Sequence, residues 1–220
     1  MLAALAAAVV ATTGACDATA TGKPGDGSKA VGSAPPALKQ TSSAAPITDA
    51  AMAAGIPPGV GSLPAGWSPK SGPTSEPCPV PGACDGLLFD VHAEYETNVV
   101  DGVQVIVKVY SNPDAATAAF AETKKEMLRG EEPPTEIALP VAGSDASAGY
   151  TWELRSQTGA EVLRSWADSA VLTGTAVIRI DMSKDPGKPS LAVLTALHTT
   201  ITARAREAQG GKPPTARLVL

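Results

Sequence analysis

The chain has 220 residues and a formal net charge of −5 at pH 7. An acidic chain without a basic stripe repels phosphate backbones, so we expect no nucleic-acid partner. The length allows one or two domains, but all the aromatic residues lie between Trp67 and Trp166, which is where a core can form. We therefore predict one folded domain, over residues 47–209.

An apolar run from Leu2 to Ala11 opens the chain, and Thr13-Gly14-Ala15 lead directly to Cys16. A membrane-spanning helix needs about 20 apolar residues. A run of about half that length before small residues indicates a signal peptide, over residues 1–15. No Lys or Arg precedes the run, so we expect the true start to lie upstream of Met1.

The residues before Cys16 resemble a bacterial lipobox, which ends in two small residues and an invariant cysteine. The resemblance implies a diacylglyceryl group on Cys16, with fatty acids such as palmitate. Two acyl chains give stable attachment, so the localisation implied is the extracytoplasmic face of the cell membrane. A secreted protein and a buried alanine-rich helix are the alternatives.

The three cysteines agree with this interpretation. Lipid on Cys16 leaves Cys78 and Cys84, which can pair because a turn-rich Pro-Val-Pro-Gly-Ala segment separates them. An oxidising compartment favours such a disulfide. Closing so short a loop contributes about 2 kcal/mol, so we predict a local cross-link and not a redox device.

Two segments are predicted to be disordered. Residues 16–46 form a linker after the lipidated cysteine, because 24 of the 34 residues from Asp17 to Ala50 are Ala, Gly, Ser, Thr or Pro. Such a composition buries too little apolar surface to offset its ordering entropy. The tail at 210–220 opens with Gly-Gly-Lys-Pro-Pro and is predicted to be disordered for the same reason.

Between these segments the pattern predicts a short helix from Thr48 to Gly55 and then a loop through Trp67 to the cysteine pair. Trp67 either covers the core or contacts a ligand. Alternating apolar residues then predict a hairpin, with strands at 89–97 and 103–110 around Asp101-Gly102.

Asn112-Pro113 begins a helix that Gly130 ends, since Asn is a good N-cap and Pro a good first helical residue. Strands are predicted at 135–139, 150–155, 161–172 and 176–182, the last three as a meander, with a loop at 140–148. Ser190 caps the last helix, which ends at Gly210-Gly211. The predicted fold class is α+β: a single antiparallel sheet of about five to six strands with two main helices packed on it.

Three segments carry a resemblance to a known group. They are the strand and Ala-rich helix from Val105 to Phe120, the strand Ala176–Asp181 and the closing amphipathic helix. They resemble actinobacterial lipoproteins and the extracytoplasmic sensor domain of mycobacterial serine/threonine kinases. The resemblance implies an α/β sandwich with a cleft that binds a ligand without turning it over. Those sensor domains carry two disulfides in other places, whereas here only Cys78 and Cys84 can pair.

Few residues suggest catalysis. His92 lies between Asp90 and Glu94 on a polar strand face, which is either solvated or a surface metal site. His198 falls in the apolar seam of the last helix, where it either packs or acts as a base. No nucleophile elbow, P-loop or dinucleotide motif occurs. We therefore expect a non-enzymatic protein with no cofactor and no metal.

Two functions remain as the main alternatives. The first is an anchored lipoprotein that binds or senses a small ligand in an aromatic-lined cleft. Its candidate lining residues, which could equally form the core, are Tyr95, Tyr110, Tyr150, Trp152 and Trp166. The second is an interaction module that docks an envelope protein or membrane complex, and an envelope hydrolase is a third. A pocket would favour the first, and a flat exposed apolar patch the second.

Overall fold

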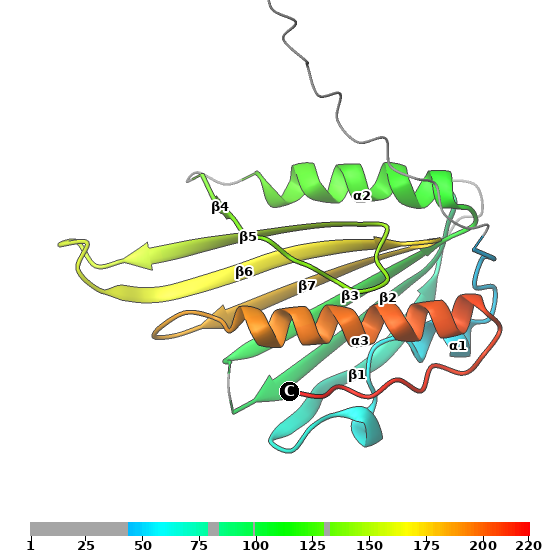
Figure 1. Ribbon diagram of the computed structural model, residues 1–220, viewed down its shortest axis with the longest axis horizontal. Helices are drawn as coiled ribbons and strands as arrows, with labels where there is room; N and C mark the ends of the chain where they lie inside the picture. The colour runs from blue at the N-terminus through cyan, green and yellow to red at the C-terminus, as the bar shows by residue number, and fades with distance from the viewer. Residues whose placement is uncertain (1–43, 79–83, 99, 130–132) are drawn as a thin grey trace, which may run out of the picture. The chain divides into compact units, whose positions relative to one another are not determined.

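The computed structural model describes residues 44–78, 84–98, 100–129 and 133–220. Its centre is a seven-stranded antiparallel sheet with the strand order β1-β2-β3-β7-β6-β5-β4, which can be followed in Figure 1. The strands are β1 (Trp67–Pro77), β2 (Leu87–Thr97), β3 (Gly102–Tyr110), β4 (Thr135–Glu136), β5 (Ala146–Arg155), β6 (Val162–Thr173) and β7 (Ala176–Lys184). The helices are α1 (Ala50–Ala54), α2 (Pro113–Met127) and α3 (Leu191–Gln209), with a short 3-10 helix at Val60–Ser62.

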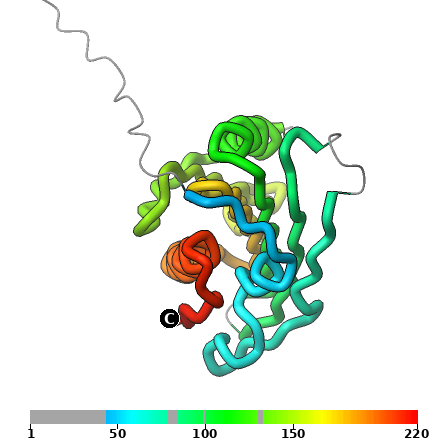
Figure 2. The backbone as a smooth tube through the Cα atoms, turned by 90° about the vertical axis from the view of Figure 1, so that its right-hand side faces the viewer, coloured from blue at the N-terminus to red at the C-terminus, as the bar shows by residue number. Residues whose placement is uncertain are grey.

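The helices α2 and α3 pack on opposite faces of the sheet (Figure 2). Side chains alternate between the two faces along each strand. Ile178 and Val171 therefore join the core under α3, whereas Val177 and Leu172 join a second, smaller core under α2. The prediction of an α+β fold with one antiparallel sheet and two main helices is confirmed.

The sheet has seven strands, so the prediction of five to six is wrong. The missed strand is β1, whose sequence WSPKSGPTSEP contains three prolines and was expected to be a loop. Proline cannot donate to a strand ladder and is confined to edge strands and bulges. Strand β1 is such an edge strand: it pairs only with β2, and its register shifts between Pro69 and Thr74.

Local sequence signals account for the helix starts. The Asn112 side chain accepts a hydrogen bond from the Ala115 backbone at 2.9 Å, and Pro113 follows it as the first residue of α2. Ser190 caps α3 in the same way, through the Val193 backbone at 3.4 Å. The cap of α1 is Asp49, one residue later than expected. Gly130, the predicted end of α2, lies outside the described residues.

The C-terminal tail differs from the prediction of disorder. Residues 212–220 form no helix or strand, yet Leu218 is buried and its backbone N–H donates to the Ser62 carbonyl at 3.2 Å. The Ala216 carbonyl accepts a hydrogen bond from Arg204 of α3 at 2.7 Å. A buried arginine therefore holds the tail against the domain, which the Gly- and Pro-rich composition of the tail does not reveal.

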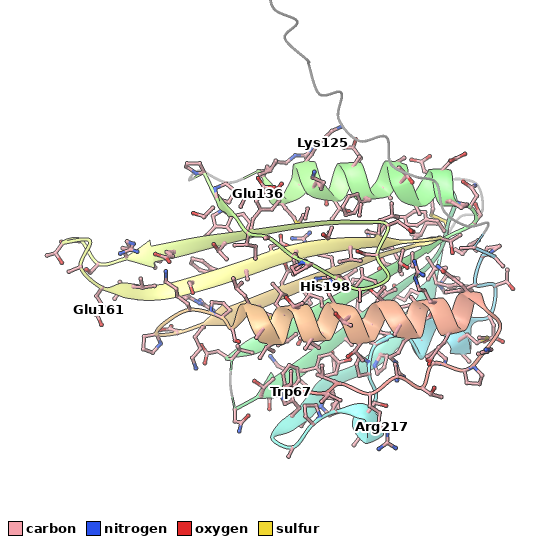
Figure 3. The ribbon with its side chains drawn as sticks, viewed as in Figure 1. Trp67, Lys125, Glu136, Glu161, His198 and Arg217 are labelled. Atoms are coloured by element: carbon pink, nitrogen blue, oxygen red, sulfur yellow. A yellow bond between two sulfur atoms is a disulfide. The ribbon has the colours of Figure 1, made fainter. Side chains whose placement is uncertain are left out.

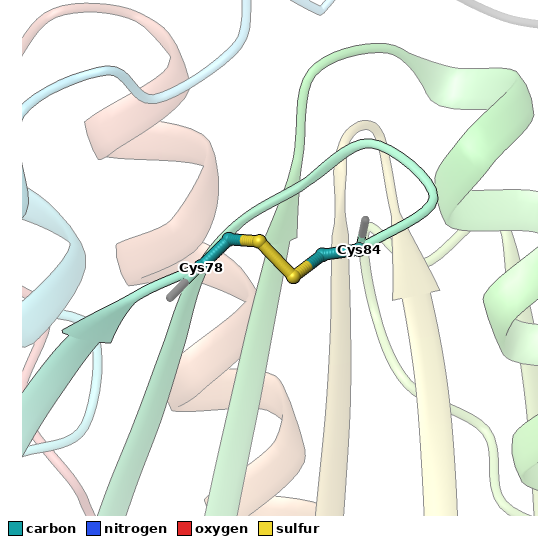
Figure 4. Close-up of a disulfide and its surroundings, with 2 residues drawn as sticks. All are labelled: Cys78 and Cys84. Atoms are coloured by element: carbon teal, nitrogen blue, oxygen red, sulfur yellow. A yellow bond between two sulfur atoms is a disulfide. The ribbon is translucent and has the colours of Figure 1, made fainter. Parts of the chain in front are cut away.

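The predicted disulfide between Cys78 and Cys84 is formed (Figure 4). It links the end of β1 to the segment before β2, with the two Cα atoms 6.2 Å apart. Cys16, the signal peptide and most of the predicted linker lie outside the described residues. Within the described ranges, none of the helices has the length and apolar character needed to cross a membrane.

Candidate ligand-binding groove

Helix α2 covers only part of its face of the sheet. Its apolar side chains Ala116, Phe120 and Met127 pack over one end of β5, β6 and β7. The hairpin of β5 and β6 extends beyond the helix (Figure 1). The sheet face that α2 leaves uncovered forms an open groove of about 450 Å³, lined by residues of β1, β2, β3, β5, β6 and β7.

Polar side chains form a row across the floor of the groove. Each member of the row lies directly opposite the next one on the neighbouring strand. The order is Glu94 of β2, Gln104 of β3, Asp181 of β7 and Asp168 of β6. Residues directly opposite each other in antiparallel strands share one face of the sheet. Three carboxylates therefore point to the same side of the sheet, although they come from three different strands.

The two aspartates of this row share one arginine. Arg179 donates to Asp168 through Nε at 3.0 Å and Nη2 at 2.7 Å, and its Nε lies 3.5 Å from Oδ1 of Asp181. Burial raises the pKa of Asp168 to about 7, with a further contribution from the neighbouring Asp181 carboxylate, and Arg179 only partly opposes this. The pair is therefore short of positive charge when both carboxylates are ionised.

Two tryptophans line the groove next to this row. Trp166 of β6 pairs with Trp152 of β5, and Trp166 is 36% exposed. The Arg164 guanidinium lies over the Trp166 ring, 5.5 Å from its centroid, which is within the range of a cation–π contact. The groove thus combines an aromatic side, formed by the β5–β6 hairpin, with an acidic floor.

The other predicted ligand contacts lie elsewhere. Tyr110 and Tyr150 are buried beneath α2 and do not line the groove. Tyr95 borders the groove, but its ring is buried in the core under α3, where its hydroxyl donates to the Pro58 carbonyl at 2.9 Å. Burial also raises the pKa of this phenol. Trp67 is buried beside Tyr95, with the ring centroids 6.3 Å apart, so it covers the core and does not line the groove.

His92 lies on the exposed face of β2. Its Nε2 is 3.0 Å from Oδ1 of Asp90, and Lys108 Nζ lies 3.6 Å from the other carboxylate oxygen. In the part of the chain that the structure describes, no group of three or more His, Cys, Asp or Glu side chains could hold a metal ion.

His198 of α3 (Figure 3) is fully buried against the sheet. Its Nε2 lies 2.8 Å from the Ser169 Oγ, whose hydroxyl donates to the Ile180 carbonyl at 3.1 Å. The ring therefore donates from Nε2, which assigns the neutral Nε2–H tautomer. Burial lowers the pKa of His198 to about 3. A serine and a base in hydrogen-bond contact resemble a catalytic pair, but a substrate cannot reach a hydroxyl that is fully buried. His198 is therefore a packed residue of the core, which is the first of the two alternatives given for it.

The acidic row was not recognised from the sequence. Asp168 and Asp181 each stand among apolar residues of a strand, and Asp168 follows Trp166 by two positions. That spacing places Asp168 and Trp166 on one face of a strand. However, the pairing of Asp168 with Asp181 depends on strand register, and the neighbours Gln104 and Glu94 come from a distant part of the chain.

No family model and no curated protein sequence matches this chain. Among solved structures, the fold is similar to the extracellular domain of PknH from Mycobacterium tuberculosis, with a TM-score of 0.41 and 9% identity over 67% of this chain and 87% of that chain. It is also similar to the Rv0999 ortholog from Mycobacterium smegmatis, with a TM-score of 0.42 and 12% identity over 73% of this chain and 98% of that chain. Likenesses at these values assign no ligand and no activity. The first structure is the kind of extracytoplasmic domain that the sequence segments resemble.

Proposed function

We propose that this protein is a lipid-anchored extracytoplasmic lipoprotein that binds a small ligand in the groove and does not turn it over. The observation that carries the proposal is the open groove of about 450 Å³ beside α2, with Trp152 and Trp166 in its lining. Small-molecule sites are concave, of this size, and combine aromatic walls with a few polar groups. The cysteine before the linker supports the anchor, and the Cys78–Cys84 disulfide supports an oxidising compartment.

The groove favours ligand binding over docking of a membrane or envelope protein. A docking module is expected to carry a broad exposed apolar patch. The exposed large apolar side chains of the described residues are instead divided among several elements. Examples are Val60 of the 3-10 helix, Leu128 after α2, Leu191 of α3, Leu154 of the β5–β6 hairpin and Val219 of the tail. Scattered apolar residues are usual on a soluble surface and indicate no partner.

Replacing Cys16 by serine is expected to release the protein from membranes. The lipid is attached through the cysteine sulfur, so a hydroxyl at this position removes the attachment. The full-length protein, expressed in an actinobacterial host, is fractionated into membrane and soluble parts and detected by immunoblot. Cys78→Ser is the control: it breaks the Cys78–Cys84 disulfide but keeps Cys16, so it should stay in the membrane fraction. Equal membrane association of wild type and Cys16→Ser would refute the anchor.

Replacing Trp166 by alanine is expected to abolish copurification of a small molecule. The full-length protein is incubated with a small-molecule extract of the cell envelope, repurified and examined by native mass spectrometry. We expect an added mass on the wild type that is absent from the variant, because Trp166 supplies exposed aromatic surface in the groove. Leu128→Ala, which removes an exposed apolar side chain outside the groove, is the control. No added mass on the wild type, or the same mass on Trp166→Ala, would contradict ligand binding in the groove.

A further inference from the structure

The charge of the groove specifies the chemistry of its ligand. Its titratable lining comprises carboxylates in excess over cationic groups: Glu94, Glu96, Asp101, Asp168 and Asp181 against Lys70 and Arg164. An anionic ligand would meet repulsion from most of the floor, whereas a cation would meet attraction.

The cationic side chains around the groove do not neutralise this excess. Lys70 lies 3.8 Å from Glu94 and Lys184 lies 3.7 Å from Asp101, and water reaches both partly exposed pairs, which weakens them. Arg179 forms ion pairs with both Asp168 and Asp181 and so supplies one positive charge for two carboxylates. Glu96 forms no ion pair with any described residue. One positive charge is therefore missing at the Asp168–Asp181 pair, of which Asp168 is buried and Asp181 partly exposed. The exposed Glu96 adds a further carboxylate without a cationic partner.

In the absence of a ligand, a proton takes the place of that missing charge at the aspartate pair. The pKa of Asp168, raised to about 7 by burial and by Asp181, means that the pair holds a proton up to neutral pH. The groups that act on the pair are Arg179 of the same β7 strand as Asp181 and, through Arg179, Glu126 of α2. A cation placed between the two carboxylates would favour their ionised forms and so would displace this proton.

We propose that the groove binds a small organic cation, with an ammonium group on the Asp168–Asp181 row and a short apolar body against Trp152 and Trp166. This proposal rests on the proposed function and names the ligand class of the same site. The aromatic side adjoins the acidic row, since Trp166 precedes Asp168 by two residues on the same strand face. Proteins commonly bind organic ammonium groups through aromatic faces together with carboxylates.

The test compares three probes with the same eight-carbon chain and different end groups. Diaminooctane, octanediol and octanedioate are titrated into the full-length protein and followed by calorimetry and tryptophan fluorescence. We expect diaminooctane to bind at least about tenfold more tightly than octanediol, and octanedioate not to bind. Diaminooctane affinity falls as salt rises. At pH 6.5 its binding releases protons, measured as a dependence of the heat on the ionisation enthalpy of the buffer.

Charge-neutralising variants locate the cation. Asp181→Asn is expected to weaken diaminooctane binding about tenfold and to reduce proton release, because burial still raises the pKa of Asp168 but the neighbouring carboxylate no longer does. Glu96→Gln, on an exposed strand position that folding tolerates, is expected to weaken binding without affecting proton release. The control is Glu161→Gln at the exposed tip of the β5–β6 hairpin (Figure 3), which changes net charge by the same amount outside the groove.

The outcomes separate this inference from the proposed function. If octanediol binds as tightly as diaminooctane and loses affinity in Trp166→Ala, the groove is a ligand site but the cation inference is wrong. If diaminooctane binds equally to wild type, Asp181→Asn and Glu96→Gln, the acidic row does not recognise it and the inference is also overturned. If none of the probes binds and no small molecule copurifies with the protein, both proposals fail.

Discussion

Replacing Arg204 by alanine is expected to lower the free energy of unfolding by about 3–5 kcal/mol. Arg204 is 5% exposed and stands on α3. Its guanidinium donates to the Gly55 carbonyl at 2.7 Å, the Ile56 carbonyl at 3.0 Å and the Ala216 carbonyl at 2.7 Å. Alanine leaves these acceptors without their donor in a place that water reaches poorly, and each such loss costs about 1–3 kcal/mol.

The measurement is urea unfolding of the full-length protein, followed by tryptophan fluorescence. Arg206→Ala is the matched control on the same helix, because the Arg206 side chain is 48% exposed and lies 3.6 Å from Asp145. Its removal is expected to cost no more than about 1 kcal/mol. Hydrogen exchange of the Leu218 amide should accelerate in Arg204→Ala, since the tail loses its contact with α3. Equal effects of the two variants would show that the buried hydrogen bonds contribute nothing specific.

Acid is expected to destabilise the protein through His198, by about 3 kcal/mol between pH 6.5 and pH 4. The pKa of this histidine falls from its usual 6.5 to about 3 because the ring is buried. The unfolded chain therefore takes up a proton below pH 6.5, while the folded protein does not until about pH 3. The stability that the neutral, buried His198 contributes is fully present above pH 6.5. It is lost as the pH falls from 6.5 toward 3.

The measurement is the free energy of unfolding at neutral pH and at pH 4 for wild type and His198→Leu. Leucine cannot take up a proton, and the Ser169 hydroxyl keeps its bond to the Ile180 carbonyl. The variant should therefore stay close to wild type at neutral pH and lose much less stability in acid. His92→Gln is the control, because His92 is the other histidine of the chain and is exposed. Asp168 acts in the opposite sense, since its raised pKa favours folding as pH falls, but all three proteins retain it. If His198→Leu loses as much free energy of unfolding between neutral pH and pH 4 as wild type does, His198 is not the cause of the acid destabilisation.

Local interactions explain why much of the fold could be predicted from the sequence. Asn112 and Pro113 determine the start of α2 through one cap and one fixed backbone angle. The apolar alternation at 89–97 and 103–110 determines a hairpin, because neighbouring side chains of a strand point to opposite faces. The disulfide could be predicted because Cys78 and Cys84 are close in the chain.

The elements that were missed depend on distant partners. Strand β1 is stable despite its prolines because it lies at the edge of the sheet beside β2, and an edge position is a property of the assembled sheet. The tail packs because Arg204 of α3 and Ser62 of the N-terminal part lie beneath it. Ser62 is far from Leu218 in the sequence, and Arg204 reaches Ala216 only because the chain turns back along α3 after Gly210, so neither contact follows from a local pattern.

The candidate site divides in the same way. The sequence by itself predicted that Trp152 and Trp166 lie on two successive strands and are possible ligand contacts. The two-residue spacing of Trp166 and Asp168 also places these two on one strand face. Only the tertiary structure decided that α2 covers Tyr110 and Tyr150 and leaves the two tryptophans at the edge of a groove. It also decided that β7 lies between β3 and β6, which places Asp181 between Gln104 and Asp168. The physical reason is that alternation along one strand is a local property, whereas strand order and register are set by burial of the whole sheet between its helices.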